Sequence, residues 1–299
     1  MAIRRALHPS GRELIFDSKV HRYTMKDIGM FTSVTGIVST YFPFDAPKIS
    51  EAIARRDGIK PEEVLEKWKM AAQLGTNTHA YIESLIKKEP FEEPKVLHGN
   101  EPVYYKAADQ LVKRVLKEYD PIAVELMVCS PKHAIAGTVD FIGRHKKSGK
   151  VLVADWKTSA STAAFRFGSF DEPCAGMLNY LHNTKINSYG LQLALYSYLI
   201  RSEGYSKVLD IPEDFLQFAE NLEHKIMILA PAPASDTNPD SGPGTAVLSH
   251  IYDTEPWKLF TPPDAEFDSP PWTVKMDRLL ANGPSVIPAF SPPKLQHAV

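Results

Sequence analysis

Two carboxylates stand inside apolar runs between residues 134 and 159, where a strand has no packing use for them. The run AIAGTVDFIG contains Asp140, and the run VLVADWKTS ends with Asp155 and Lys157. Apolar runs of this length, bounded by Gly, Ser and Lys, predict two strands of a partly buried sheet. An unpaired charge is costly to bury, so we expect the two aspartates to share a cation, with Lys157 on the same strand face as Asp155.

The acid-x-Lys triplet gains its meaning from this context. Other triplets occur at 17–19, 93–95 and 223–225, and none of them closes a hydrophobic run that has a second acid upstream. A further strand at 125–128 begins with Glu125. The alternative is a surface hairpin with an ordinary salt bridge. The pattern favours the site of a metal-dependent phosphodiesterase.

Hydrophobic periodicity predicts the remaining elements. A hairpin is expected at 13–26, and two more strands are expected at 225–230 and 245–251. Helices are expected at 32–42, at 47–88 with a break at 58–61, at 101–119 and at 188–203. Helices that lead into a mixed sheet, followed by a helix and a return strand, predict an α/β core.

Composition limits the class of protein. The chain has 299 residues, of which 43% are hydrophobic, so it can bury the core of one elaborated domain. It has no run of 18 apolar residues and no secretory signal pattern, so we expect an intracellular protein without a membrane span. The net charge of −2 is not that of a protein that coats nucleic acid. Because bound metal ions supply local positive charge, it does not exclude DNA as a partner.

The C-terminal part differs in composition from the rest. Thirteen of the 24 prolines follow residue 230, and residues 231–299 contain four basic and eight acidic residues. We expect 231–244 to be a flexible excursion between two strands. The last dozen residues are either a partner-binding peptide or, more simply, disordered.

The order of polar residues resembles the RecB-like branch of the PD-(D/E)XK nuclease superfamily, over about residues 70–230. The segment SVTGIVSTYF is also similar to the opening segment of stand-alone phage and mitochondrial genome-maintenance exonucleases. Val139 stands where the superfamily name has Pro, within a Gly-x-x-Asp step that this branch often uses. The residues that carry the resemblance are His79, which follows GTNT at the expected opening of a helical segment, Glu125, Asp140, Asp155, Lys157, Gln192 and Tyr196.

The resemblance implies a PD-(D/E)XK restriction-endonuclease-like fold, with a central mixed sheet flanked by helices. It divides the chain into an N-terminal hairpin and helical elaboration at 1–69, a nuclease core at 70–260 and a Pro-rich extension at 261–299. It also implies one or two Mg²⁺ or Mn²⁺ ions. Cys129 and Cys174 are too few for the iron–sulfur cluster of some relatives, and we expect both to be free thiols.

The resemblance assigns roles to the site residues. Asp140, Asp155 and the main-chain carbonyl of Trp156 would bind metal, and His79 would bind a second ion, although a lone helical histidine is usually structural. Lys157 would orient or help deprotonate the attacking water and offset charge in the transition state. Glu125 would ligate through water or hold a basic partner.

The helical pair Gln192 and Tyr196 would contact the substrate backbone or brace the site, with ordinary packing as the alternative for Tyr196. Ser33, Thr35 and Tyr41 would contact phosphate near the N-terminus or form a capped helix start.

These features predict a metal-dependent DNA exonuclease, acting on single-stranded or end-processed DNA in replication, recombination or repair alongside other proteins of those processes. Its location would be the bacterial host of a phage or an organelle matrix. The alternatives are a structure-specific endonuclease of the same fold and a catalytically silent DNA-binding subunit, against which the intact Asp140, Asp155 and Lys157 argue. A metallohydrolase of small phosphoesters is disfavoured, since the chain has no His-rich ligand set. The sequence leaves open whether the substrate is DNA or RNA and whether it is single- or double-stranded. It also leaves open the direction of exonuclease digestion and the oligomeric state.

Overall fold

The computed structural model describes residues 3–159, 173–212, 221–231, 247–254, 276 and 279–280. The strands are β1 (Ile3–Leu7), β2 (Glu13–Asp17), β3 (Arg22–Met25), β4 (Gly29–Ser33), β5 (Tyr119–Ser130), β6 (Ile135–His145), β7 (Val151–Thr158), β8 (Leu222–Pro231) and β9 (Val247–Thr254). The main helices are α1 (Val34–Tyr41), α2 (Ala46–Asp57), α3 (Pro61–Lys87), α4 (Glu101–Glu118) and α6 (Lys185–Ser202), with the short α7 (Tyr205–Val208) and the 3-10 turn η1 (Gly176–Leu178).

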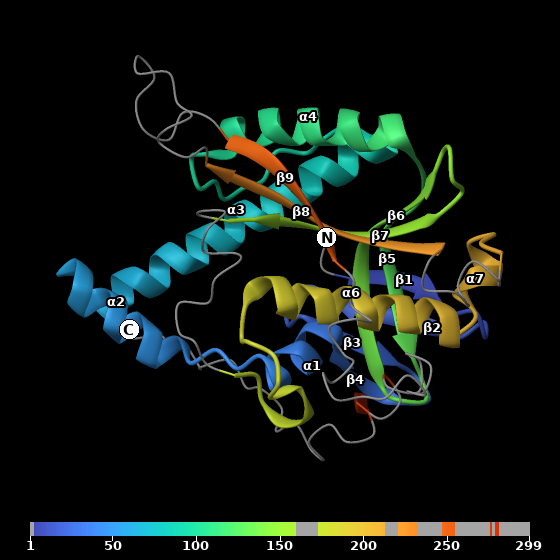
Figure 1. Ribbon diagram of the computed structural model, residues 1–299, viewed down its shortest axis with the longest axis horizontal. Coiled ribbons are helices and arrows are strands. Elements are labelled where there is room, and N and C mark those ends of the chain that lie inside the picture. Colours follow the sequence, from blue (N-terminus) through green and yellow to red (C-terminus); the bar gives the residue numbers. More distant parts are fainter. Residues whose placement is uncertain are drawn as a thin grey trace.

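All the strands of this described part belong to one mixed sheet. Its order is β1-β2-β3-β4-β6-β7-β8-β9, and β5 pairs with β6. The β4–β6 and β7–β8 pairs are parallel, and the others are antiparallel. Helices α3 and α4 cover one face, and α1 and α6 cover the other (Figure 1). The expected α/β class, with a mixed sheet flanked by helices, is confirmed.

The central strands are buried on both faces, and neighbouring residues alternate between two cores. Phe141 on β6 and Leu152 on β7 pack with α3 and α4, whereas Ile142 and Val153 pack with α1 and α6. This explains why these strands read as continuous apolar runs instead of alternating ones.

The expected N-terminal hairpin is β2 and β3. Their inward side chains, which include Leu14 and Tyr23, share a core with Met127 and Cys129 of β5. The ladder from β1 to β4 continues into β6, where Thr32 pairs with Ile135. Residues assigned to the N-terminal elaboration and to the core therefore share one sheet.

The predicted break near residue 58 separates α2 from α3. Gly58 ends α2 in the left-handed conformation, with φ +68°, which glycine adopts without a Cβ penalty. Pro61 then occupies the first turn of α3, where its missing N–H costs nothing.

The expectation that residues 75–79 open a helical segment is wrong. They lie inside the 27-residue helix α3. The hydroxyls of Thr76 and Thr78 donate back to the carbonyls of Ala72 and Leu74, so they do not cap a helix start. Gly75 instead allows a close approach to β7, since a Cβ there would lie 3.2 Å from Thr158 Oγ1.

No described helix is both long enough and apolar enough to cross a membrane. Cys129 and Cys174 are free and buried. Residues 232–244 of the expected excursion and the last dozen residues lie outside the described residues.

Candidate functional site

The site lies where β6 and β7 separate. Their ladder runs from Arg144↔Val151 to Phe141↔Ala154 and ends there, and the beginning of β6 pairs with β4 instead. Asp140 and Asp155 are the next residues on the two strands. Asp140 Oδ2 accepts a hydrogen bond from the Trp156 backbone N–H at 2.9 Å, so the carboxylate satisfies a donor that the ladder leaves free.

Asp155 is held from two sides. Only 1% of it is exposed, and its Oδ2 forms an ion pair with the ammonium of Lys157 on the same strand. Its Oδ1 accepts a hydrogen bond from Gln192 Nε2 of α6 at 2.9 Å. The Lys157 ammonium also lies 4.8 Å from the centre of the Tyr189 ring, a cation–π contact. Asp155 and Lys157 therefore lie on the same face of β7, as predicted.

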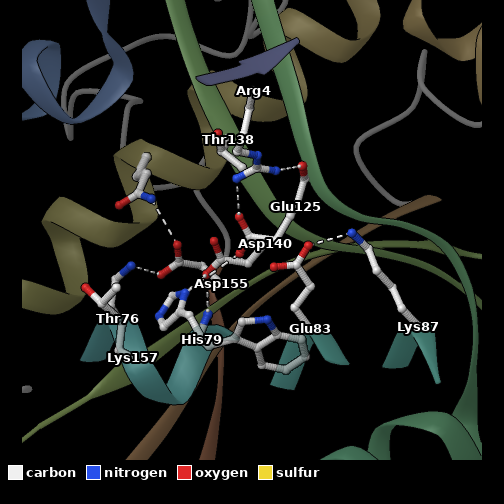
Figure 2. A network of polar contacts seen from close by, with 12 residues as sticks. Arg4, Thr76, His79, Glu83, Lys87, Glu125, Thr138, Asp140, Asp155 and Lys157 are labelled. Carbon is white, nitrogen blue, oxygen red and sulfur yellow. Dashed lines mark hydrogen bonds and ion pairs between the residues drawn. The ribbon is translucent and has the colours of Figure 1, made fainter. Parts of the chain in front are cut away.

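His79 projects from α3 towards the carboxylates (Figure 2). Its Nδ1 lies 3.5 Å from Asp140 Oδ2 and 4.0 Å from Glu125 Oε1. The ring also hydrogen-bonds to the Trp156 backbone. Burial, followed by the positive charge of Lys157, lowers the pKa of His79 to about 4. His79 is therefore neutral at pH 7, which is the form that binds a metal ion.

Glu125 reaches the site through an unusual backbone conformation. It lies between the pairs Val124↔Phe141 and Leu126↔Val139, beside Asp140, with φ +52°. Arg4 of β1 donates to Glu125 twice, from Nη2 to the backbone oxygen at 2.8 Å and from Nη1 to Oε2 at 3.2 Å. Glu125, Asp140 and His79 each place a donor atom within 4.8 Å of the others.

The carboxylates are crowded and short of positive charge. Burial, followed by the charges of Asp155 and Glu125, raises the pKa of Asp140 well above its usual value. Burial also raises the pKa of Glu125, which Arg4 offsets in part. Two carboxylate donors suit Mg²⁺ or Mn²⁺, the neutral imidazole can also bind a metal ion, and a cation would relieve the repulsion between the acids. The donor set therefore fits the expected metal.

Lys157, in contrast, lies close to negative charges that favour its protonated form. Burial alone would lower its pKa, but the charges of Asp155 and Asp140 outweigh burial and raise it above its usual value. Lys157 is a cation at neutral pH and offers protons instead of accepting them.

The site opens into a cavity of about 1000 Å³. Its walls are the N-terminal strands, the middle of α3 and the beginning of α6. Ser33 borders the cavity, but its side chain caps α1 by accepting a hydrogen bond from Gly36 N at 3.0 Å. Of the two expected roles for Ser33, the capped helix start is therefore the one present. Tyr41 is buried and donates to the Leu279 carbonyl at 2.9 Å, so it is not a phosphate contact.

The structure brings the predicted side chains together. Those bordering the cavity are His79, Glu125, Asp140, Asp155, Lys157, Gln192 and Tyr196. The side chain of Trp156 points away and packs with Phe141, at 5.6 Å between ring centres, so its backbone alone serves the site. Gln192 contacts Asp155 and Tyr196, an arrangement that braces the acid.

Three contributors were missed or misplaced by sequence reasoning. Tyr189 precedes Gln192 by three residues on α6, a spacing that does signal a shared helix face. Arg4 lies 121 residues from Glu125, and nothing local in the sequence signals their contact. Glu83, one turn after His79 on α3, borders the cavity and pairs with Lys87 at 2.5 Å.

Comparison with known proteins finds no family model that matches the chain and no curated protein that matches it. The superfamily resemblance therefore stays a prediction.

Proposed function

We propose that this chain is a divalent-metal-dependent deoxyribonuclease with a PD-(D/E)XK core, acting as an exonuclease. The supporting observation is the separation of β6 and β7, which gathers two aspartates, a glutamate, a histidine and a lysine at one end of a large cavity. A structural salt bridge would account for Asp155 and Lys157. It would not account for Asp140, whose pKa is raised by burial and then by two neighbouring acids.

The residues divide into metal-binding and charge-offsetting groups. Asp140, Glu125 and His79 would hold Mg²⁺ or Mn²⁺, with Asp155 and the Trp156 carbonyl completing the site, and the ion would supply Lewis-acid activation at the phosphate. Gln192 fixes Asp155, and Asp155 fixes Lys157. As a cation, Lys157 offsets the negative charge that builds on the phosphate and donates a hydrogen bond to an oxygen there. Its raised pKa supports this role over proton abstraction from water.

The cavity has room for part of a polymeric substrate. At about 1000 Å³, it stands at the upper end of the range of about 300–1,000 Å³ typical of small-ligand sites. Helix α3 forms a wall from Ala71 to Glu83 beside the metal-binding side chains. A wall of this kind favours a single strand that enters by its end, which is the basis for preferring an exonuclease.

The decisive experiment is digestion of end-labelled linear and covalently closed circular DNA, single- and double-stranded, with Mg²⁺ or Mn²⁺. We expect linear single strands to be degraded and circles of the same sequence to survive. The Asp140→Asn variant, purified in the same way, controls for contaminating nucleases. Efficient cutting of circles would establish the endonuclease alternative. Full activity in excess EDTA would refute the metal mechanism.

A further inference from the structure

Arg4 contacts Glu125 at two points of the same residue. One guanidinium nitrogen holds the Glu125 backbone oxygen at 2.8 Å, and another holds Oε2 at 3.2 Å. The second carboxylate oxygen, Oε1, remains directed towards His79 Nδ1 at 4.0 Å. Arg4 therefore fixes both the backbone and the carboxylate of Glu125 (Figure 2), while Arg4 does not bind Oε1, the oxygen that faces His79.

Glu125 needs such a hold. Its φ of +52° lies in the left-handed region, which a side chain with a Cβ disfavours, and it interrupts the pairing of β5 with β6. Strained residues of this kind persist where surrounding contacts determine their conformation. The two bonds from Arg4 provide such contacts, since they act on the carbonyl and the side chain of the strained residue.

The position of Arg4 depends on the N-terminal strand. β1 is an edge strand of the sheet, paired with β2 from Ile3↔Asp17 to Leu7↔Glu13. Its outward residues Ile3, Arg5 and Leu7 are exposed, whereas Arg4 is half-buried and borders the cavity. Strand β3, on the other side of β2, is tied to the site by a hydrogen bond between the Tyr23 hydroxyl and Thr138 Oγ1 at 2.9 Å.

We propose that Arg4 is a positioning residue of the metal site, acting through Glu125, so that the N-terminal strand is a working part of the site and not an appendage. This inference rests on the proposed function only for the identity of the ion. Partners that orient a metal ligand commonly change metal affinity by about 10- to 100-fold when they are removed.

The test measures Mn²⁺ binding to the DNA-free full chain, by calorimetry and by electron paramagnetic resonance. Arg4→Ala should weaken the tightest Mn²⁺ site by about 10- to 100-fold. Arg5→Ala is the matched control, because Arg5 lies on the same strand but is exposed and pairs with Glu13 at 2.5 Å. It should bind Mn²⁺ as the wild type does. Removing a cation near the site would by itself tighten metal binding, so unchanged or tighter binding by Arg4→Ala overturns the inference.

Two further variants isolate the route of the effect. In a Glu125→Gln background, Arg4→Ala should weaken Mn²⁺ binding no further, because Arg4 acts through Glu125; an additional loss of similar size would contradict this. Arg4→Lys keeps the charge but cannot make both bonds in the same fork geometry, so it should also bind Mn²⁺ more weakly. It serves as the readout if Arg4→Ala fails to fold, and wild-type binding by Arg4→Lys would refute the two-point hold.

The outcomes separate this inference from the proposed function. If the wild type binds Mn²⁺ and Arg4→Ala binds it equally well but raises the KM for DNA, Arg4 contacts substrate and only the positioning role fails. If the wild type binds no Mn²⁺, the metal site itself fails and both proposals are overturned.

Discussion

Tyr196 packs so closely on Gly137 that a Cβ built on the glycine would lie 2.7 Å from Tyr196 Cε1. The hydroxyl of Tyr196 accepts a hydrogen bond from Gln192 Nε2 at 3.2 Å, and the same amide donates to Asp155 at 2.9 Å. A chain of contacts therefore runs from β6 through α6 to the acid on β7. The small residue at 137 decides how deeply the tyrosine, and with it the bracing glutamine, can approach.

Gly137→Ala should displace Tyr196 and loosen the hold on Asp155. We expect a loss of about 1–3 kcal/mol in the free energy of unfolding, the usual range for overpacking, together with slower DNA cleavage. Urea unfolding and single-turnover rates measure the two effects. In a Tyr196→Leu background, where the ring is absent, the alanine should cost less, and the remaining cost would come from Val34, whose Cγ2 would lie 3.1 Å from the new Cβ. Additive losses in the double variant would contradict this contact as the cause.

Asp140→Asn should stabilise the metal-free protein while abolishing cleavage. Burial and the two neighbouring acids raise the pKa of Asp140 above that of an unfolded aspartate. The folded state then binds this proton more tightly, so the ionised group lowers stability once the pH rises above about 3.9. An asparagine oxygen still accepts from the Trp156 N–H without the charge. Urea unfolding in EDTA should show the variant more stable than the wild type at pH 7, and a gap of the same size at pH 3.5 would contradict the electrostatic origin.

His224 predicts how stability depends on pH. It is buried on β8, its Nε2 lies 2.7 Å from Ser197 Oγ, and burial lowers its pKa to about 3. Between about pH 6.5 and this value, the unfolded chain binds a proton that the folded chain does not, so stability falls as the pH falls. From pH 6.5 to pH 5 this residue alone should account for a loss of about 2 kcal/mol.

His224→Gln tests this dependence, because glutamine can keep a hydrogen bond to Ser197 without titrating. Unfolding in denaturant between pH 5 and pH 7 should show a shallower pH dependence than in the wild type. His21→Asn is the control, since His21 is exposed and asparagine tolerates its φ of +49°. If His224→Gln and the wild type lose stability in parallel on acidification, His224 is not a source of the acid sensitivity.

Local pattern was sufficient for much of the fold. The strands with Asp140 and Asp155, the hairpin and the helix break near Gly58 are all set by periodicity and by residues with strong backbone preferences. The expectation of a helix start at 75–79 was wrong because threonine and asparagine are also the residue types that commonly cap a helix N-terminus. Helix α3 runs through them without a break, as the helical periodicity of 47–88 indicated, and Gly75 lies against Thr158 there.

The sequence could not reveal how the site is held. The separation of β6 from β7 depends on β4 pairing with the beginning of β6, a contact between residues about 100 positions apart. The left-handed conformation of Glu125 and its contact with Arg4 also depend on segments that are far apart in the sequence. The acids were predictable because buried charge is conspicuous in an apolar run. Their geometry was not, because it arises from long-range pairing.

Lys157→Met should damage stability as well as catalysis. Asp155 is 1% exposed and forms its ion pair with Lys157, so the substitution leaves a buried carboxylate without its counter-charge. Removing one partner of a buried pair typically costs about 3–5 kcal/mol. We expect a loss of that order in urea unfolding with EDTA present. With Mg²⁺ or Mn²⁺ present, cleavage should fall by about 100- to 1000-fold, the usual effect of removing a group that stabilises transition-state charge.

Lys225→Met is the matched control for stability. The Lys225 side chain is 17% exposed against 20% for Lys157, but its partner Asp253, at 2.6 Å, is 77% exposed. An aspartate in solvent needs no counter-charge, so this variant should lose about 1 kcal/mol or less. In the double variant Asp155→Asn/Lys157→Met, much of the stability should return while cleavage stays low, because no charge is then left unpaired. Equal losses in Lys157→Met and Lys225→Met would show that Asp155 does not depend on Lys157, and near wild-type cleavage by Lys157→Met would remove the lysine from the mechanism.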